Sequence, residues 1–575
     1  MIPKSGTSTR KGWLSKAILA SVCAAGFSAT AAHAQQINTV FYILMENRNW
    51  TQGSDVSLAQ IEGSSAAPYI NSLITAGSVT PPGGGAAVNN SAQVSWCSCY
   101  HNVLSTSTGT PPSIHPSEPN YVWMEAGSNL SKLDDNDPYG STNSVLQIYN
   151  FLQANPTFTG ENLSGLLQNA GISWKAYQEG IDLQDGSGGN YNVTRTSNGI
   201  TNNLVSVGSR TVPLVSFAGT SAAYTNPYNG SHQYNFAVKH CGSLFFPATN
   251  GSTVTTANTS TSNVAVSHYA PLEELIPDLT ANTNVAQYNV ITPDQFNDMH
   301  TALSGGFTYT PTTANGNFGT GVHYTGDLAQ VAQGDNFLAT LVPKIMASPV
   351  YQAGHAAIVI WTDETEGSPQ NDFYHTLMEI VISPLAKGNA YKSTVNYTHS
   401  SDIATFQKVF GVTANTPTGY LNDAANASSI TVGTPINNPS TSLPYDGWGT
   451  TNAQDLSDLF QSGVIPASIP GLNLTPSGFA FNRRANTYSQ TVTVTNALSS
   501  AITNPVYLVV GNLTNTTLTN SAGTTVNNFP GNSYVSVSPS GLAAGASVTV
   551  TLQFSAPTSG GLNDTLSVIN TASQP

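Results

Sequence analysis

The sequence predicts an α/β domain followed by a smaller all-β domain. The spacing of apolar residues changes near residue 470, which marks the expected boundary between the two domains. Over residues 35–465, short apolar runs alternate with helical segments, a pattern typical of an α/β sheet with parallel strands. From residue 470 to 575, apolar and polar residues alternate, and Gly, Asn, Ser and Pro separate the runs. About a hundred residues of this kind favour an immunoglobulin-like β-sandwich.

The elements of the first domain follow from the lengths of its apolar runs. We expect buried strands at 38–45, 288–292, 356–362 and 378–383. Two longer segments predict helices, one at 161–171, where a glycine closes the pattern, and one at 335–348. Strands that alternate with helices in this way place the ligand site beyond the carboxyl ends of the strands.

The second domain is predicted from four alternating runs. We expect its strands at 489–496, 534–541, 546–554 and 564–570. Residues 462–478 are the expected hinge between the two domains. No segment of the second domain carries a catalytic pattern, so we expect it to be a spacer or an adhesion module.

The first 34 residues have the pattern of an export signal. A start with four Lys and Arg residues precedes a short apolar core, and the small residues AHA end at Ala34. The apolar run is too short for a membrane anchor, and no later segment is apolar enough to span a bilayer. We therefore expect residues 1–34 to be removed as a signal peptide and the protein to be secreted or periplasmic.

The charge balance argues against nucleic acid as a partner. The formal net charge is −14, and loss of the four basic residues within 1–34 would make it −18 (−14 − 4). A chain this acidic is poorly suited to bind a phosphate backbone. The sequence does not indicate an oligomeric state.

Three cysteines remain after removal of the predicted signal peptide: Cys97, Cys99 and Cys241. An odd number allows at most one disulfide within the chain. Because Cys97 and Cys99 are very close in sequence, we expect Cys241 to pair with one of them. Their spacing matches none of the usual cysteine patterns for zinc.

Polar residues follow three of the predicted strands of the first domain. They are Glu46 and Asn47 after 38–45, Asp363 and Glu364 after 356–362, and Asn297, Asp298 and His300 after 288–292. Each group alone is compatible with a solvated turn or a helix cap. Together, at corresponding strand ends, they predict a divalent cation site, with Mg, Ca or Mn favoured by the oxygen ligands and Fe or Zn still open.

The stretch HPSEPN, residues 115–120, adds a candidate nucleophile. Ser117 stands just before a helix predicted to start near Pro119, and free N–H groups at a helix N-terminus suit phosphate. A serine hydroxyl needs a metal or a base to become a good nucleophile. The alternative is that Ser117 simply caps the helix, with Glu118 in the first turn.

The span from about 37 to 412 resembles a family of phosphoesterases that includes secreted acid phosphatases and bacterial phospholipases C, within the alkaline-phosphatase-like α/β superfamily. Eight segments carry the resemblance in family order: VFYILMENRNW, HPSEPNYVWMEAG, GISWKAYQEG, KHCGSLFF, QFNDMH, WTDETEG, HTLMEIVISPLAKG and YTHSSDIATFQKVFGV. Two segments depart from the pattern. Asp372 and His375 are not adjacent where the family often has an Asp-His pair, and KHCGSLFF replaces the more usual KHNPFVYF.

The resemblance implies a role for each matching residue. Metal ligands would be Glu46, Asn47, Asp363, Glu364 and Ser117, and Ser117 would also be the nucleophile. Asn120 would assist oxyanion binding. The histidines that would contact phosphate or protonate the leaving group are His115, His240, His300 and His375, while the role of His399 is left open.

These observations favour a secreted, metal-dependent acid phosphatase that hydrolyses phosphate monoesters through a serine nucleophile. A phospholipase C or another phosphodiesterase is the alternative within enzymes. The alternative outside enzymes is a surface binding protein with an inactive catalytic fold. The presence of Glu46, Ser117 and Asp363 argues against the last of these.

Overall fold

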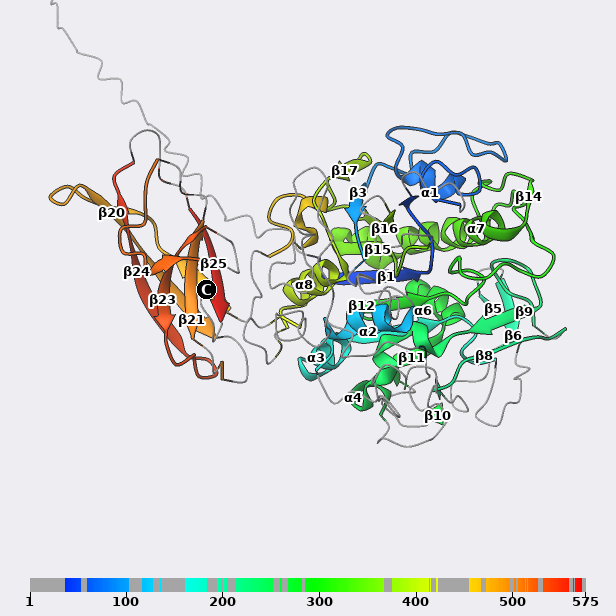
Figure 1. Cartoon of the computed structure of the whole chain (residues 1–575), viewed down its shortest axis with the longest axis horizontal. Helices are drawn as coiled ribbons and strands as arrows, with labels where there is room; N and C mark the ends of the chain where they lie inside the picture. Colours follow the sequence, from blue (N-terminus) through cyan, green and yellow to red (C-terminus); the bar gives the residue numbers. More distant parts are fainter. Residues whose placement is uncertain are drawn as a thin grey trace, which may run out of the picture. The chain divides into compact units, whose positions relative to one another are not determined.

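The structure is a computed structural model (Figure 1). It describes residues 37–52, 59–102, 116–127, 135, 161–183, 194–197, 200–203, 212–222, 224–251, 259–260, 267–281, 285–366, 375–412, 414, 420–421, 455–466, 472–496, 501–502, 505–511, 513, 515–525, 531–557, 562 and 564–570. The predicted signal peptide lies outside the described residues, so its removal stays a prediction. Within the described part, no helix is both long and apolar enough to cross a bilayer.

A nine-stranded mixed sheet forms the centre of the first domain. Its main order is β11 (Tyr269–Pro271), β4 (Trp174–Gln178), β12 (Tyr288–Thr292), β1 (Thr39–Met45), β15 (Ala356–Thr362), β16 (His375–Ile382), β3 (Val94–Tyr100) and β17 (Tyr391–Ser393), with β2 (Thr51–Gln52) paired to β16. The strands from β11 to β15 are parallel. β16 runs antiparallel to both β15 and β3, so the expectation of a parallel sheet is wrong at this strand.

Helices cover both faces of this sheet, and alternate residues of β1 show the two layers. Val40, Tyr42 and Leu44 belong to a core shared with α2 (Glu118–Ala126), α3 (Leu163–Asn169) and α8 (His399–Phe410). The residues between them belong to a second core, shared with α1 (Pro68–Leu73), α6 (Leu275–Ala281) and α7 (Gly326–Ala347). Since side chains alternate across a strand, these cores lie on opposite faces. The first domain is therefore a three-layer α/β structure.

Smaller elements complete the first domain. Four two-stranded sheets are described: β5 (Thr194–Ser197) with β6 (Ile200–Asn203), β7 (Val212–Pro213) with β10 (Thr259–Ser260), β8 (Phe217–Thr220) with β9 (Gln233–Phe236), and β13 (Phe307–Thr308) with β14 (His323–Tyr324). Between β9 and the short helix α4 (Pro247–Asn250), the 3₁₀ turn η3 (Val238–His240) precedes a second such turn. Turn η3 carries His240.

The C-terminal part contains two four-stranded antiparallel sheets. One holds β18 (Leu472–Pro476), β19 (Ala480–Asn482), β20 (Thr487–Asn496) and β24 (Ser547–Ser555); the other holds β21 (Val506–Gly511), β22 (Gly523–Thr524), β23 (Ser533–Ser538) and β25 (Thr565–Asn570). Both sheets contribute to one apolar core. Because β18 falls within the expected hinge 462–478, that prediction is wrong for Leu472–Pro476. The immunoglobulin-like topology stays a prediction.

The three described cysteines are free thiols, so the predicted disulfide is wrong. Cys97 lies buried on β3, where its Sγ is 3.4 Å from the Val395 carbonyl oxygen. Cys241 is also buried, with its Sγ 3.5 Å from Ser243 Oγ. The sulfurs of Cys97 and Cys241 thus each lie against a polar neighbour, and neither is bonded to another sulfur.

Candidate active site

The acidic residues at the ends of β1 and β15 emerge side by side. These strands are parallel neighbours, and Met45 pairs in register with Thr362. Glu46 and Asp363 therefore follow the two strands at the same level, and Glu364 comes next. All three carboxylates are buried, and one oxygen from each lies within 4.8 Å of the others.

The backbone around Glu46 is fixed by specific contacts. Asn47 has φ = 52°, a left-handed conformation that few residues other than glycine adopt and that often accompanies functional sites. Its N–H donates to Asp363 Oδ1 at 2.8 Å, and the Glu364 N–H donates to the same oxygen at 2.8 Å. The Glu46 N–H donates to the Asp298 carbonyl at 2.8 Å. Three strand-end loops are thereby held together.

Ser117 directs its hydroxyl into this acidic group. It stands before the first residue of α2, where its Oγ lies 2.6 Å from Glu46 Oε1 and 2.9 Å from Glu364 Oε1. Its side chain makes no hydrogen bond to the backbone of the helix, so the reading of Ser117 as a simple helix cap is wrong. One turn into the helix, Asn120 Nδ2 donates to Glu364 Oε2 at 2.9 Å.

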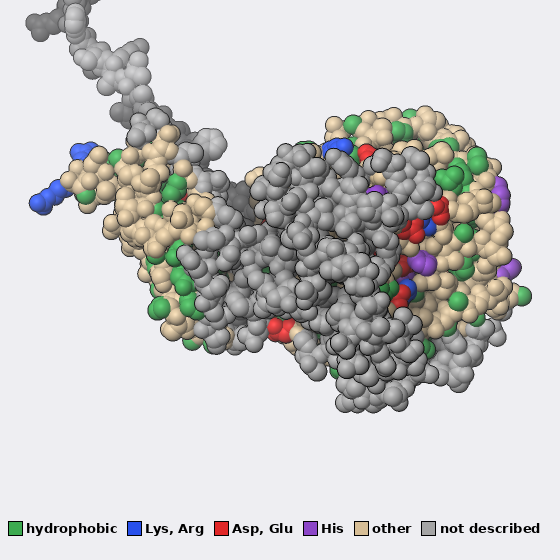
Figure 2. Space-filling model, in the orientation of Figure 1, with side chains coloured by type: hydrophobic (Ala, Val, Ile, Leu, Met, Phe, Trp, Pro, Cys, Tyr) green, Lys and Arg blue, Asp and Glu red, His purple; other side chains and the backbone are tan. Residues whose placement is uncertain are grey.

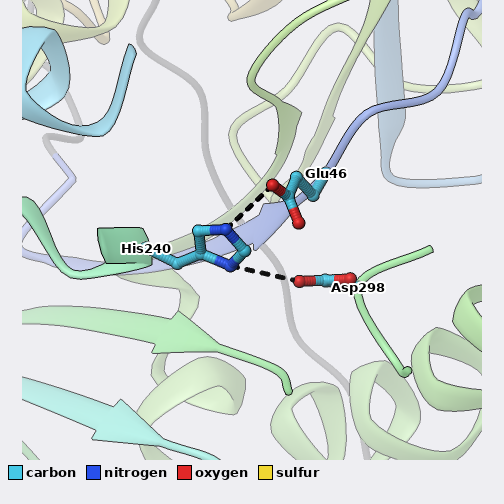
Figure 3. A group of neighbouring side chains, drawn as sticks. All are labelled: Glu46, His240 and Asp298. Carbon is cyan, nitrogen blue, oxygen red and sulfur yellow. Dashed lines mark ion pairs between the residues drawn. The ribbon is translucent and has the colours of Figure 1, made fainter. Parts of the chain in front are cut away.

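His240 lies between two carboxylates, as Figure 3 shows. Its Nε2 is 2.8 Å from Glu46 Oε1, and its Nδ1 is 3.3 Å from Asp298 Oδ2. The ring also stacks on Tyr121, with 4.7 Å between centroids. Burial lowers the pKa of His240, whereas burial and the charge of Glu46 raise the pKa of Asp298 well above its usual range. This geometry holds Glu46 and Asp298 on either side of one imidazole.

Asp298 stands among the polar residues that follow the predicted strands, but the family resemblance assigns it no role. Its position in the loop after β12 is the sequence signal that identifies it. Among the described residues, Glu46, His240 and Asp298 form a second group able to hold a metal ion, and this group shares Glu46 with the first.

The other predicted histidines occupy different positions. His300 is half-buried, its N–H donates to Asp298 Oδ1 at 2.8 Å, and its Nδ1 is 2.8 Å from Thr301 Oγ1. His375 opens β16 opposite Gln52, and neither group of candidate metal ligands includes it. His115 lies outside the described residues, so its predicted role is untested.

His399, whose role was left open, is fully buried at the first residue of α8. Its Nε2 lies 2.7 Å from the Asp363 carbonyl oxygen and donates a hydrogen bond to it. Burial lowers the pKa of His399 to about 3, so the ring is neutral. This histidine therefore supports the backbone of the acidic loop.

The donor atoms fit a divalent cation. Burial raises the pKa of Asp363 well above its usual range, and the charges of Glu364 and Glu46 raise it further. Three buried oxygens of these predicted ligands have no hydrogen-bond partner among the described residues: Glu46 Oε2, Asn47 Oδ1 and Asp363 Oδ2. Crowded carboxylates and an amide oxygen without partners are the ligand set that hard cations bind. All five predicted ligands meet here, since Ser117 and Glu364 join the same cluster.

Comparison with known proteins gives a family match over part of the chain. Residues 111–308 match the model of the Phosphoesterase family. The chain is therefore a hydrolase that acts on ester bonds. The matched span contains Ser117, Asn120 and His240, whereas Glu46 and Asp363 lie outside it. No curated protein matches the chain.

Several solved structures are similar at low identity. One is a protein in the alkaline phosphatase superfamily from Vibrio parahaemolyticus, with 10% identity, a TM-score of 0.31, and coverage of 80% of this chain and 77% of that chain. A phosphonate monoester hydrolase of Agrobacterium radiobacter has 9% identity, a TM-score of 0.31, and coverage of 80% and 87%. A putative sulfatase from Bacteroides thetaiotaomicron has 10% identity, a TM-score of 0.33, and coverage of 80% and 82%. At these values the similarities do not indicate a shared substrate.

Proposed function

We propose that this phosphoesterase is a secreted, metal-dependent acid phosphatase that hydrolyses phosphate monoesters with Ser117 as the nucleophile. The position of the Ser117 hydroxyl carries the proposal. It lies at the N-terminus of α2 and within 2.9 Å of both Glu46 and Glu364. A serine that only stabilised the helix would bond to the backbone instead.

The residues that would hold the cation are Glu46, Asn47, Ser117, Asp363 and Glu364. A divalent cation there would act as a Lewis acid, lower the pKa of the serine hydroxyl and balance charge on the phosphoryl oxygens. The chain adds positive charge of its own at Lys239, whose Nζ is 2.8 Å from Asp135 Oδ2. Burial lowers the pKa of Lys239, but the charges of Glu46 and Asp135 raise it well above its usual value, so the side chain stays cationic.

The reaction proceeds in two displacements on phosphorus. Ser117 Oγ forms a bond to phosphorus as the bond from phosphorus to the ester oxygen breaks, and the hydroxyl proton passes to the adjacent Glu46 carboxylate. His300, whose backbone N–H donates to Asp298 Oδ1, gives a proton from its half-buried imidazole to the leaving oxygen. Water then attacks the phosphoserine, His300 regains a proton from that water, and Ser117 recovers its own as phosphate leaves. The first step therefore needs a proton on the general acid.

His240 has a positioning role in this scheme. Both of its ring nitrogens face carboxylates, Glu46 on one side and Asp298 on the other. It therefore fixes the orientation of Glu46, while the half-buried His300 is better placed to meet a leaving group. This assignment revises the role that the resemblance suggested for His240.

The test compares two buried serines that each donate to a carboxylate. Ser117→Ala should lower kcat on p-nitrophenyl phosphate by at least about a thousandfold, because it removes the nucleophile. Ser164→Ala is the matched control, because Ser164 on α3 donates from its Oγ to Glu125 Oε1 at 2.7 Å. This variant should keep full turnover. A folded Ser117→Ala protein with a loss below about tenfold, a barrier change of ~1.4 kcal/mol, would refute the nucleophile.

The same assay tests the metal and the substrate class. A chelator should abolish turnover, and excess divalent cation should restore it. Glu46→Ala should lose bound metal and activity together, whereas Ser117→Ala should retain metal. Faster hydrolysis of bis(p-nitrophenyl) phosphate than of the monoester would make the phosphodiesterase alternative correct. No turnover of either ester with any divalent cation would favour the binding protein.

A further inference from the structure

The C-terminal part concentrates its positive charge at one point. Residues 467–575 contain two basic residues, Arg483 and Arg484, and one acidic residue, Asp564. The two arginines are adjacent, in a chain whose formal net charge is −14. They therefore form a local cationic spot on an otherwise acidic protein.

The structure places both arginines in the turn of an exposed hairpin, between β19 and β20. The turn is well defined, because Asn482 Oδ1 accepts hydrogen bonds from the N–H groups of Arg484 and Ala485 at 3.1 and 3.2 Å. All residues from 475 to 486 are exposed. Neither arginine forms an ion pair with any acidic residue that the structure describes. Figure 2 shows basic side chains (blue) projecting clear of the C-terminal sheets.

Two phenylalanines lie beside this turn. Phe479 is 37% exposed and Phe481 is 47% exposed, and they account for half of the large hydrophobic residues classed as exposed in the described part. Phe481 lies on β19, and Phe479 stands one residue before that strand. Each ring is held by one aromatic neighbour, Phe481 by Tyr488 at 4.8 Å and Phe479 by Phe554 at 5.7 Å. The hairpin thus presents ordered apolar rings next to a pair of guanidinium groups.

We infer that this hairpin, residues 475–488, docks on a bilayer surface that contains anionic phospholipid. A guanidinium group can form a bidentate pair with a lipid phosphate. Both arginines are available for such a pair, because neither forms an ion pair with a described acidic residue. Aromatic rings beside them can enter the interfacial layer, where exposed phenylalanine is removed from water. The acidic remainder of the chain would be repelled by the same surface, so binding should occur through this cationic tip.

Vesicle co-sedimentation of the full chain tests the inference. The protein should sediment with vesicles of phosphatidylglycerol and phosphatidylcholine in equal parts, and should stay in the supernatant with phosphatidylcholine alone. Each positive charge near an anionic surface raises the affinity about fivefold. The double variant Arg483→Gln with Arg484→Gln should therefore weaken binding about 25-fold. Phe479→Ser with Phe481→Ser should weaken it at least about tenfold. High salt should weaken binding of the wild type but change the arginine variant much less.

Matched controls come from the first domain. Val322→Ser with Leu328→Ser removes the other two exposed hydrophobic side chains, 47% and 41% exposed, and Lys392→Gln removes an exposed cation; all should bind as the wild type does. Circular dichroism should show that every variant is folded. Equal binding to both kinds of vesicle, or unchanged binding by the arginine variant, would overturn the inference. The inference would also be overturned if the phenylalanine variant still bound vesicles and dextran sulfate fully displaced the protein from them. That result would identify a soluble polyanion as the ligand.

Discussion

Ser117 differs from a helix-capping serine in where its hydroxyl bonds. A capping side chain accepts from the backbone N–H groups of the first turn, and its loss typically costs about 1 kcal/mol. Ser117 gives up that stabilisation, and its Oγ lies against Glu46 and Glu364 instead. A hydroxyl has one proton, so it can donate to only one of these carboxylates at a time. The arrangement suits a reacting oxygen better than a structural one.

A prediction for a single residue concerns His399. His399→Leu leaves the Asp363 carbonyl buried without its donor, so unfolding free energy should fall by about 1–3 kcal/mol and metal affinity should fall with it. His399→Gln keeps an N–H donor at a similar reach and should recover much of both. Because the ring is neutral above pH 3, neither variant should shift the pH profile of turnover. Isothermal titration measures the metal affinity, and pH-rate measurements give the profile. A shifted profile would contradict the positioning role and would make His399 a proton donor instead.

The sequence identified most of the cluster, for a physical reason. Glu46 and Asp363 follow buried apolar runs directly, and parallel strands bring their carboxyl ends to one edge of a sheet. The contact between His240 and Asp298 could not be predicted in this way. His240 comes from a short 3₁₀ turn that has no periodic pattern, and its partner depends on how that turn packs.

At the scale of elements, α3 is attached to α2 by a buried carboxylate. Glu125 on α2 accepts hydrogen bonds from Asn162 Nδ2 at 2.9 Å, from the Ser164 N–H at 3.0 Å and from Ser164 Oγ at 2.7 Å. It therefore takes up free donors at the N-terminus of α3, where no intrahelical partner exists. Because α2 carries Ser117 at its start, this contact also helps to hold the reactive helix.

Glu125→Ala should therefore destabilise the fold without touching the chemistry. It leaves three buried donors unpaired, and we expect unfolding free energy to fall by about 3 kcal/mol. Ser164→Ala, which removes one of the three donors, should cost about 1 kcal/mol. Urea unfolding followed by fluorescence gives both values. A loss for Glu125→Ala no larger than that for Ser164→Ala would show that α3 is held by apolar packing instead.

Some elements were predictable from the sequence and others were not. β12 and β15 begin and end where their apolar runs do, because a fully buried strand has little polar sequence within it. The direction of β16 was not predictable, since a buried run has the same pattern in either orientation. The start of α7 was placed nine residues too late, at 335 instead of Gly326, because Gly, Asp and Gln interrupt the apolar residues of its first turns.

At the scale of the whole molecule, buried carboxyl groups make the free energy of unfolding depend on pH. Asp335 accepts hydrogen bonds from the N–H groups of Tyr69 and Ile70 and from the Tyr309 hydroxyl, and burial raises its pKa to about 7. Burial also raises the pKa of Asp402 and of Glu179 to about 7. These groups lie in different parts of the first domain, so their effects on stability should add.

The contribution of these three carboxyl groups to stability should accordingly fall as pH rises from about 4 to 7. In this window the folded protein keeps protons on these carboxyl groups, while the unfolded chain, with an ordinary pKa near 4, loses them. Each such group then lowers the unfolding free energy by about 1.4 kcal/mol per pH unit, and the loss levels off above pH 7. Asp335→Asn has no proton to lose and retains an oxygen acceptor, so its stability should depend less steeply on pH than that of the wild type. Thermal unfolding of both proteins at pH 5, 6, 7 and 8 measures the difference. A Tm that depends on pH as steeply in Asp335→Asn as in the wild type would contradict a buried, protonated Asp335.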